Sequence, residues 1–159
     1  MSDYERAARR ERLDALRASG IAPYPARTGP HESVARVRER FEHATAEELE
    51  AQAPAVAVVG RIMAVRSFGK LVFLQLLQDG ARIQVSARKQ EMEPAAFDFV
   101  RKQVDVGDFV RVEGVVWRTK KDELTVDARA VGMLAKTLRP LPEKWHGLAD
   151  VEARFERRA

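Results

Sequence analysis

Val59–Arg88 reads VGRIMAVRSFGKLVFLQLLQDGARIQVSAR, a pattern that predicts three β-strands joined by two tight turns. Strict alternation along Leu71–Leu77 and Arg82–Ala87 gives each strand one apolar face and one mixed face. The mixed face carries Phe73, Gln75, Arg82, Gln84 and Ser86. An aromatic ring among amides and cations on an exposed sheet face is unusual, because burial normally removes aromatic rings from the surface.

This mixed face suits a flat, hydrogen-bonding, anionic ligand, which describes a single-stranded nucleic acid. The candidate nucleic-acid-binding residues are Arg66, Phe73, Gln84, Glu123, Arg82, Gln75 and Lys70. Phe73 would stack a base, Gln84 and Glu123 would contact base edges, and the two arginines would meet phosphate or stack. Lys70 lies at a loop tip, where a lysine is either solvated or a backbone contact. In the alternative interpretation, N-terminal helices cover Phe73, and the pattern alone does not separate the two.

The order of the predicted elements indicates the fold. Three strands, a helix over residues 89–104 and two more strands follow one another along the chain. The expected strands are 55–66, 71–77, 82–87, 109–118 and 123–130, with Gly60 a bulge or bend in the first. This order is that of the oligonucleotide-binding (OB) fold, a five-stranded Greek-key barrel. The predicted fold class is therefore mainly β, with an N-terminal helical extension and an extended C-terminal linker.

Three domains or segments are expected: a helical extension over residues 1–54, the barrel over 55–135 and a linker over 136–159. The extension should contain a helix over residues 3–19 with Leu13 and Leu16 as its apolar contacts. Its arginines form either a phosphate-facing ridge or an ordinary solvated face. Ser33 is the expected cap of a second helix, and Thr45 with Glu48 forms a capping box that opens a third.

Composition excludes several classes of protein. The 159 residues carry a formal net charge of +4 and a pI near 9.7, which permits a polyanionic partner without requiring one. The chain has no cysteine, which excludes disulfides and thiolate-bound zinc, and its three histidines lack ligand spacing, so no metal ligands are expected. Without a signal peptide or a membrane-spanning run, a cytoplasmic protein with no membrane partner is expected. No phosphate-binding loop or nucleophile motif occurs, so no catalytic residue is assigned.

Several longer motifs carry a family resemblance. GRIMAVRSFGKLVFLQL, DGARIQV, GDFVRVEGVVWRTKKDELTV, LAKTLRPLPEKWHGLADVEARF and the opening RRERLDALRASGIAPYP resemble the N-terminal part of class II lysyl-tRNA synthetase. The similarity covers essentially the whole chain, and LRPLPEKWHGL is its most specific motif. Three departures occur: the chain ends at FERRA, Leu77 is extra before a shortened turn, and Ser86–Ala87 replace bulkier strand residues.

The resemblance implies an anticodon-binding barrel joined to a catalytic domain that this chain lacks. Its anticodon-reading positions fall on Arg66, Phe73, Gln84 and Glu123, and a lysine anticodon has uridine at its centre. The implied partner is the tRNA anticodon stem-loop, together with a synthetase catalytic domain or a homodimer partner. ATP and magnesium, and with them lysine–tRNA ligase activity, would belong to the catalytic domain, so no cofactor is expected here. A general single-strand-binding protein and a protein-interaction module remain the alternatives.

Overall fold

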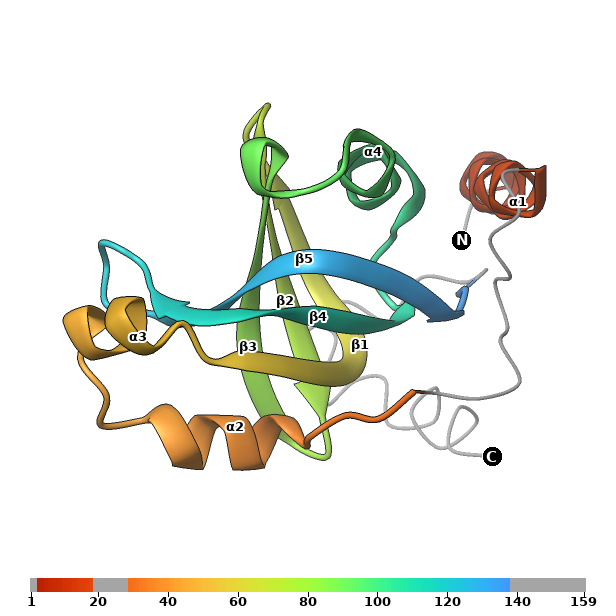
Figure 1. Cartoon of the computed structure of the whole chain (residues 1–159). Coiled ribbons are helices and arrows are strands. Elements are labelled where there is room, and N and C mark those ends of the chain that lie inside the picture. Colours follow the sequence, from red (N-terminus) through yellow and green to blue (C-terminus); the bar gives the residue numbers. More distant parts are fainter. Residues whose placement is uncertain (1–2, 19–28, 138–159) are drawn as a thin grey trace.

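The computed structural model describes residues 3–18 and 29–137, whose strands close into a barrel with helices around it (Figure 1). The strands are β1 (Ala55–Ser67), β2 (Leu71–Gln78), β3 (Ala81–Arg88), β4 (Phe109–Arg118) and β5 (Leu124–Ala135). The helices are α1 (Asp3–Ala18), α2 (Val34–Phe41), α3 (Ala46–Gln52), the 3₁₀ turn η1 (Lys89–Glu91) and α4 (Pro94–Gln103). Of the linker predicted over residues 136–159, only Lys136 and Thr137 lie within the described residues.

The strands close in the order β1-β2-β3-β5-β4, and only the β3–β5 pairing is parallel. This closure confirms the predicted OB-fold barrel. It also removes the exposed strand edges that an open five-stranded sheet would present.

The β2–β3 hairpin fixes which side chains face outward. Its two turn residues, Asp79 and Gly80, have φ values of 49° and 82°, as a type I′ turn requires. Gln78 pairs with Ala81, and no register shift follows along the two strands. Val72, Leu74, Leu76, Ile83, Val85 and Ala87 are buried as predicted. The extra Leu77 is therefore accommodated in a regular hairpin, and Phe73 faces outward.

Two element boundaries and the position of one bulge differ from the sequence prediction by more than one residue. The helix predicted from residue 89 begins at Pro94, because proline fits the first helical position, and residues 89–91 form a 3₁₀ turn. The bulge in β1 lies between Ile62 and Ala64 rather than at Gly60. Gly60 instead permits close packing, since a Cβ there would lie 3.0 Å from the Leu77 carbonyl oxygen. β5 continues to Ala135, five residues beyond the predicted end.

Helices close both ends of the barrel core. Phe97 and Val100 of α4 pack into the end of the core near the top of Figure 1, and α2 and α3 lie at the opposite end. The predicted Ser33 cap and the Thr45–Glu48 capping box are both present. The buried helical side chains at that end are Val34, Val37, Phe41 and Leu49.

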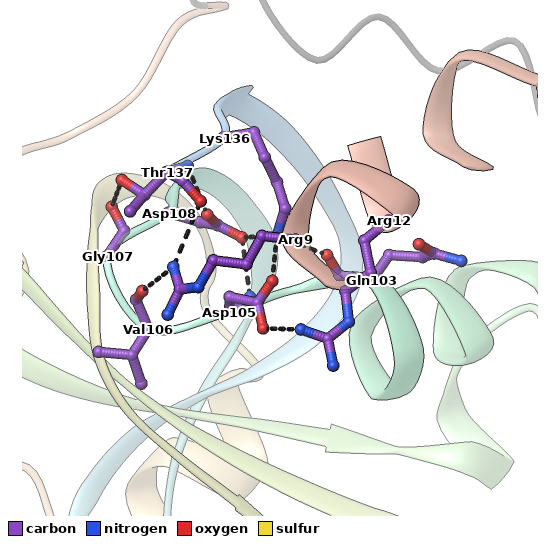
Figure 2. A network of polar contacts seen from close by, with 9 residues as sticks. All are labelled: Arg9, Arg12, Gln103, Asp105, Val106, Gly107, Asp108, Lys136 and Thr137. Atoms are coloured by element: carbon purple, nitrogen blue, oxygen red, sulfur yellow. Dashed lines mark hydrogen bonds and ion pairs between the residues drawn. The ribbon is translucent and has the colours of Figure 1, made fainter. Parts of the chain in front are cut away.

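A buried polar network joins α1 to the barrel (Figure 2). The Lys136 ammonium, fully buried, donates to Asp105 and Asp108 at 2.6 Å each, and to the Gln103 carbonyl at 3.0 Å. Arg12 of α1 forms an ion pair with Asp105. Arg9 donates to the carbonyl oxygens of Val106 and Thr137.

These contacts give two of the N-terminal arginines a role that neither sequence interpretation contained. Arg9 and Arg12 dock the helix onto the barrel instead of forming a phosphate-facing ridge or a solvated face. Leu13 is buried as predicted, whereas the Leu16 side chain lies outside the described part of the structure. Burial raises the pKa of the Asp108 carboxyl despite the bond from Lys136. For Asp105, the bonds from Lys136 and Arg12 outweigh burial and lower its pKa.

Lys136→Met should destabilise the fold strongly. The substitution leaves the buried Asp108 carboxylate, and the partly buried Asp105 carboxylate, without their shared cation, and breaking a buried ion pair in this way costs about 3–5 kcal/mol. Urea unfolding at pH 7 measures the loss. The matched control is Lys102→Met on the exposed face of α4, which should change stability little. Equal effects of the two substitutions would show that the network does not stabilise the fold.

Candidate nucleic-acid interface

A hollow of about 380 Å³ opens on the outer face of β1, β2 and β3, beside the β4–β5 turn. Its lining residues are Ala64, Arg66, Phe73, Leu74, Gln75, Gln84, Lys121 and Glu123. Five of the seven predicted site residues therefore meet in this first hollow. Arg82 lines a second hollow that adjoins it, and Lys70, at the β1–β2 turn, lines neither.

Phe73 is the aromatic floor of the first hollow, and its neighbours are a cation and a second ring. The Arg66 guanidinium lies over the Phe73 ring, 5.5 Å from its centroid. Phe68, at the tip of the β1–β2 turn, is 61% exposed and meets Phe73 edge to face with centroids 6.3 Å apart. Both neighbours are exposed, so the Phe73 ring borders on solvent.

Gln84 is held in one orientation by its neighbours. The buried Thr125 hydroxyl donates to the Glu123 carbonyl oxygen, so its oxygen is left to accept from the Gln84 amide at 3.0 Å. The Gln84 Oε1 in turn accepts from Arg66 at 3.4 Å. An amide has two N–H donors and two lone pairs on its oxygen. One donor and one acceptor position of Gln84 are therefore left for a ligand.

Arg118 fixes the turn that carries Glu123 and Lys121. Its guanidinium donates to three carbonyl oxygens where α2 ends, those of Phe41, Glu42 and Ala44, at 2.6–3.3 Å. It also donates to the Asp122 carbonyl oxygen within the turn. Cations commonly satisfy the free carbonyls at a helix C-terminus. The α2–α3 corner thus anchors the β4–β5 turn beside the first hollow.

Beyond Gln84, the outer face of β3 is closed. Ser86 was predicted on the mixed face, but its side chain is fully buried, because Trp117 of β4 covers it and donates to its oxygen at 3.1 Å. Ser86 in turn donates to Asp127 at 2.8 Å, and Arg88 binds the same carboxylate through two nitrogens. Burial raises the pKa of Asp127, but the hydrogen bonds from Arg88, Ser86 and Arg129 outweigh it, so the net pKa is lowered.

Sequence reasoning missed Phe68, Thr125 and Arg118. Phe68 had a usable signal, since an aromatic residue beside a turn glycine is rarely exposed without a reason. Thr125 and Arg118 had none, because their roles depend on which strands and helices become neighbours in the closed barrel.

Two general features of the described residues bear on function. Within residues 3–18 and 29–137, no group of three or more His, Asp or Glu side chains is placed to hold a metal ion. No helix in that same part of the chain is long and apolar enough to cross a membrane.

Comparison with known proteins gives a family match and a set of relatives. The model of the family described as "OB-fold nucleic acid binding domain" matches residues 56–134. The lysine–tRNA ligase of Magnetococcus marinus is 41% identical over 156 residues, which cover 96% of this chain and 30% of that protein. The ligase of Moorella thermoacetica is 43% identical, with 96% and 29% covered, and that of Enterococcus faecalis is 39% identical, with 94% and 30% covered. The chain spans about three-tenths of the length of these relatives.

Acid should weaken the fold in part through Asp127. Its folded pKa is lowered, so the unfolded chain takes up the proton first as the pH falls below about 4, the usual aspartate value. The stability that Asp127 provides is complete above that pH and is lost as the pH falls through its folded pKa. Asp127→Asn should therefore be less stable at pH 7 and lose less stability between pH 5 and pH 3. Urea unfolding across this range tests it, and parallel pH curves for the two proteins would contradict it.

Proposed function

Residues 56–134 belong to the anticodon-binding OB-fold family, in a chain homologous to the N-terminal part of lysine–tRNA ligases, and we propose that this chain recognises the anticodon of lysine tRNA. The observation that most directly supports this proposal is that Phe73, Gln84 and Glu123 line the same hollow. In this proposal the ATP- and lysine-dependent ligation belongs to the part of the relatives that the chain does not span. A synthetase catalytic domain or a homodimer partner would then be its protein partner.

A base entering the first hollow would stack on Phe73 in place of the Arg66 guanidinium. The exposed cation–π contact is worth about 0.5–1 kcal/mol, whereas stacking of a base on an aromatic ring is worth about 1–3 kcal/mol. The base therefore displaces the Arg66 guanidinium from the face of the Phe73 ring. Arg66 forms no ion pair within the described residues, so its guanidinium is available for the RNA backbone once displaced.

The groups left open by Gln84 and Glu123 match uracil. The pairing edge of uracil presents two acceptor oxygens on either side of one N–H. Gln84 donates its remaining N–H to an oxygen and accepts from the ring N–H, and the Glu123 carboxylate accepts only. Cytosine lacks the N3 hydrogen, so an acceptor would face an acceptor, which is costly away from water.

Phe73→Ala should weaken binding of a lysine anticodon stem-loop by about 1–3 kcal/mol through lost stacking. Its effect on stability should be smaller than that of Phe97→Ala, since Phe97 is 1% exposed and truncation of a buried phenylalanine costs about 3–5 kcal/mol. Fluorescence titration and thermal unfolding measure the two effects. A Phe73 variant that unfolds as readily as the Phe97 variant would make Phe73 a core residue instead.

Base choice gives the sharper test. A stem-loop with U at the central anticodon position should bind more tightly than the same loop with C, by about 1–3 kcal/mol. Gln84→Ala and Glu123→Ala should each reduce this preference. Thr125→Val should do the same at nearly unchanged side-chain volume, because it frees the Gln84 amide to rotate. Equal affinity of the wild type for both loops would leave a general single-strand-binding protein, and no binding to either would leave an interaction module.

A further inference from the structure

The second hollow, of about 360 Å³, adjoins the first on the same outer face of the barrel. It is lined by Arg38, Gln75, Gly80, Arg82, Ile83, Gln84 and Glu123. Gln75, Gln84 and Glu123 line both hollows and so form their common border. A strand that places one nucleotide in the first hollow therefore meets the second hollow at a neighbouring nucleotide.

The chemistry of the second hollow differs from that of the first. It has no aromatic ring, and the side chain of its one large apolar residue, Ile83, points into the barrel core. Two arginines from different elements converge on it, Arg38 from α2 and Arg82 from β3. This lining offers no stacking surface, but it suits an anionic group.

Neither arginine is neutralised by a carboxylate within the described residues. Arg38 donates to the Arg82 carbonyl oxygen at 3.1 Å, and Arg82 donates to the Gln75 side-chain oxygen at 2.9 Å. Both acceptors are neutral. Glu123 borders the hollow on the side of the first one, so an anion is favoured on the opposite side, near the arginines.

Among the arginines of α2, only Arg38 lacks a carboxylate partner within the described residues. Arg36 and Arg40 both contact the carboxylate of Glu32. Arg38 lies on a different side of the helix, toward the sheet. Its position is fixed because the Val34 backbone N–H, in the first turn of α2, donates to Gln78 of β2 at 2.8 Å. α2 is thereby held beside the β2–β3 hairpin, as Figure 1 shows.

We propose that the second hollow binds a backbone phosphate of the RNA, next to the nucleotide held in the first hollow, through Arg38 and Arg82. The proposal rests on the proposed function and adds the helical extension to the RNA-binding surface. Both arginines keep unused N–H donors, and a guanidinium presents them in the paired geometry that phosphate oxygens accept. A phosphate contact positions the strand without reading its sequence.

The test compares Arg38→Ala with Arg36→Ala, two substitutions that remove the same charge from the same helix. Arg38→Ala should weaken binding of a lysine anticodon stem-loop about tenfold, the size of one charge-assisted hydrogen bond, and equally for loops with U or C at the centre. The slope of log affinity against log salt concentration should fall by about 0.7. Arg38→Lys should keep the wild-type slope, and Arg36→Ala should change neither quantity. Thermal unfolding verifies that each variant is folded.

A neutral methylphosphonate at each loop linkage in turn locates the phosphate. At one linkage, the methylphosphonate should weaken binding by the wild type but should not weaken binding by Arg38→Ala any further. That linkage carries the phosphate that Arg38 contacts. If the wild type binds the stem-loop but Arg38→Ala and Arg36→Ala weaken binding equally, the proposed phosphate site is wrong. The proposed function would still stand in that case. If the folded wild type does not bind the stem-loop, the proposed function fails, and this inference fails with it.

Discussion

The parallel pairing of β3 with β5 is the constraint on which both the core and the site depend. Three residue pairs form it: Gln84 with Thr125, Val85 with Val126, and Ser86 with Asp127. The middle pair is buried in the core, and the outer pairs are joined by side-chain hydrogen bonds of 3.0 and 2.8 Å. Gly114 allows the approach from β4, since a Cβ there would lie 2.2 Å from the Asp127 carbonyl oxygen. The pairing that closes the barrel therefore also orients Gln84.

This arrangement divides the site into a rigid and an adjustable part. Gln84 is oriented by the buried Thr125, and the turn that carries Glu123 is anchored by Arg118. Arg66 and Phe68, in contrast, are exposed at the open end of the hollow. Discrimination between bases needs fixed donors and acceptors, because a group that can rotate satisfies several ligands equally well. In the proposed function, Gln84 and Glu123 would carry this discrimination, whereas Arg66 would contact the RNA backbone, a contact that tolerates movement.

Local patterns predicted much of this architecture, and non-local neighbours account for what they missed. Alternation together with the Asp79–Gly80 turn predicted the faces of β2 and β3, because both signals act over a few residues. The burial of Ser86 was missed because Trp117, which covers it, arrives from β4. The ring and cation contacts of Phe73 likewise come from Phe68 and Arg66, whereas the sequence allowed N-terminal helices to cover it. The nucleic-acid roles of these residues stay predictions.

Arginine shows why composition says so little about the interface. Arg12 docks α1 onto the barrel, Arg118 binds the carbonyl oxygens where α2 ends, and Arg40 is neutralised by a carboxylate. The formal charge of +4 counts all of them alike. Around the two hollows, four cations face the single carboxylate of Glu123; they are Arg38, Arg66, Arg82 and Lys121. These cations lie within about a Debye length of a strand crossing the hollows at physiological salt. Since attraction at that range follows local and not total charge, these four cations, which have no ion pair within the described residues, make the surface around the hollows locally cationic.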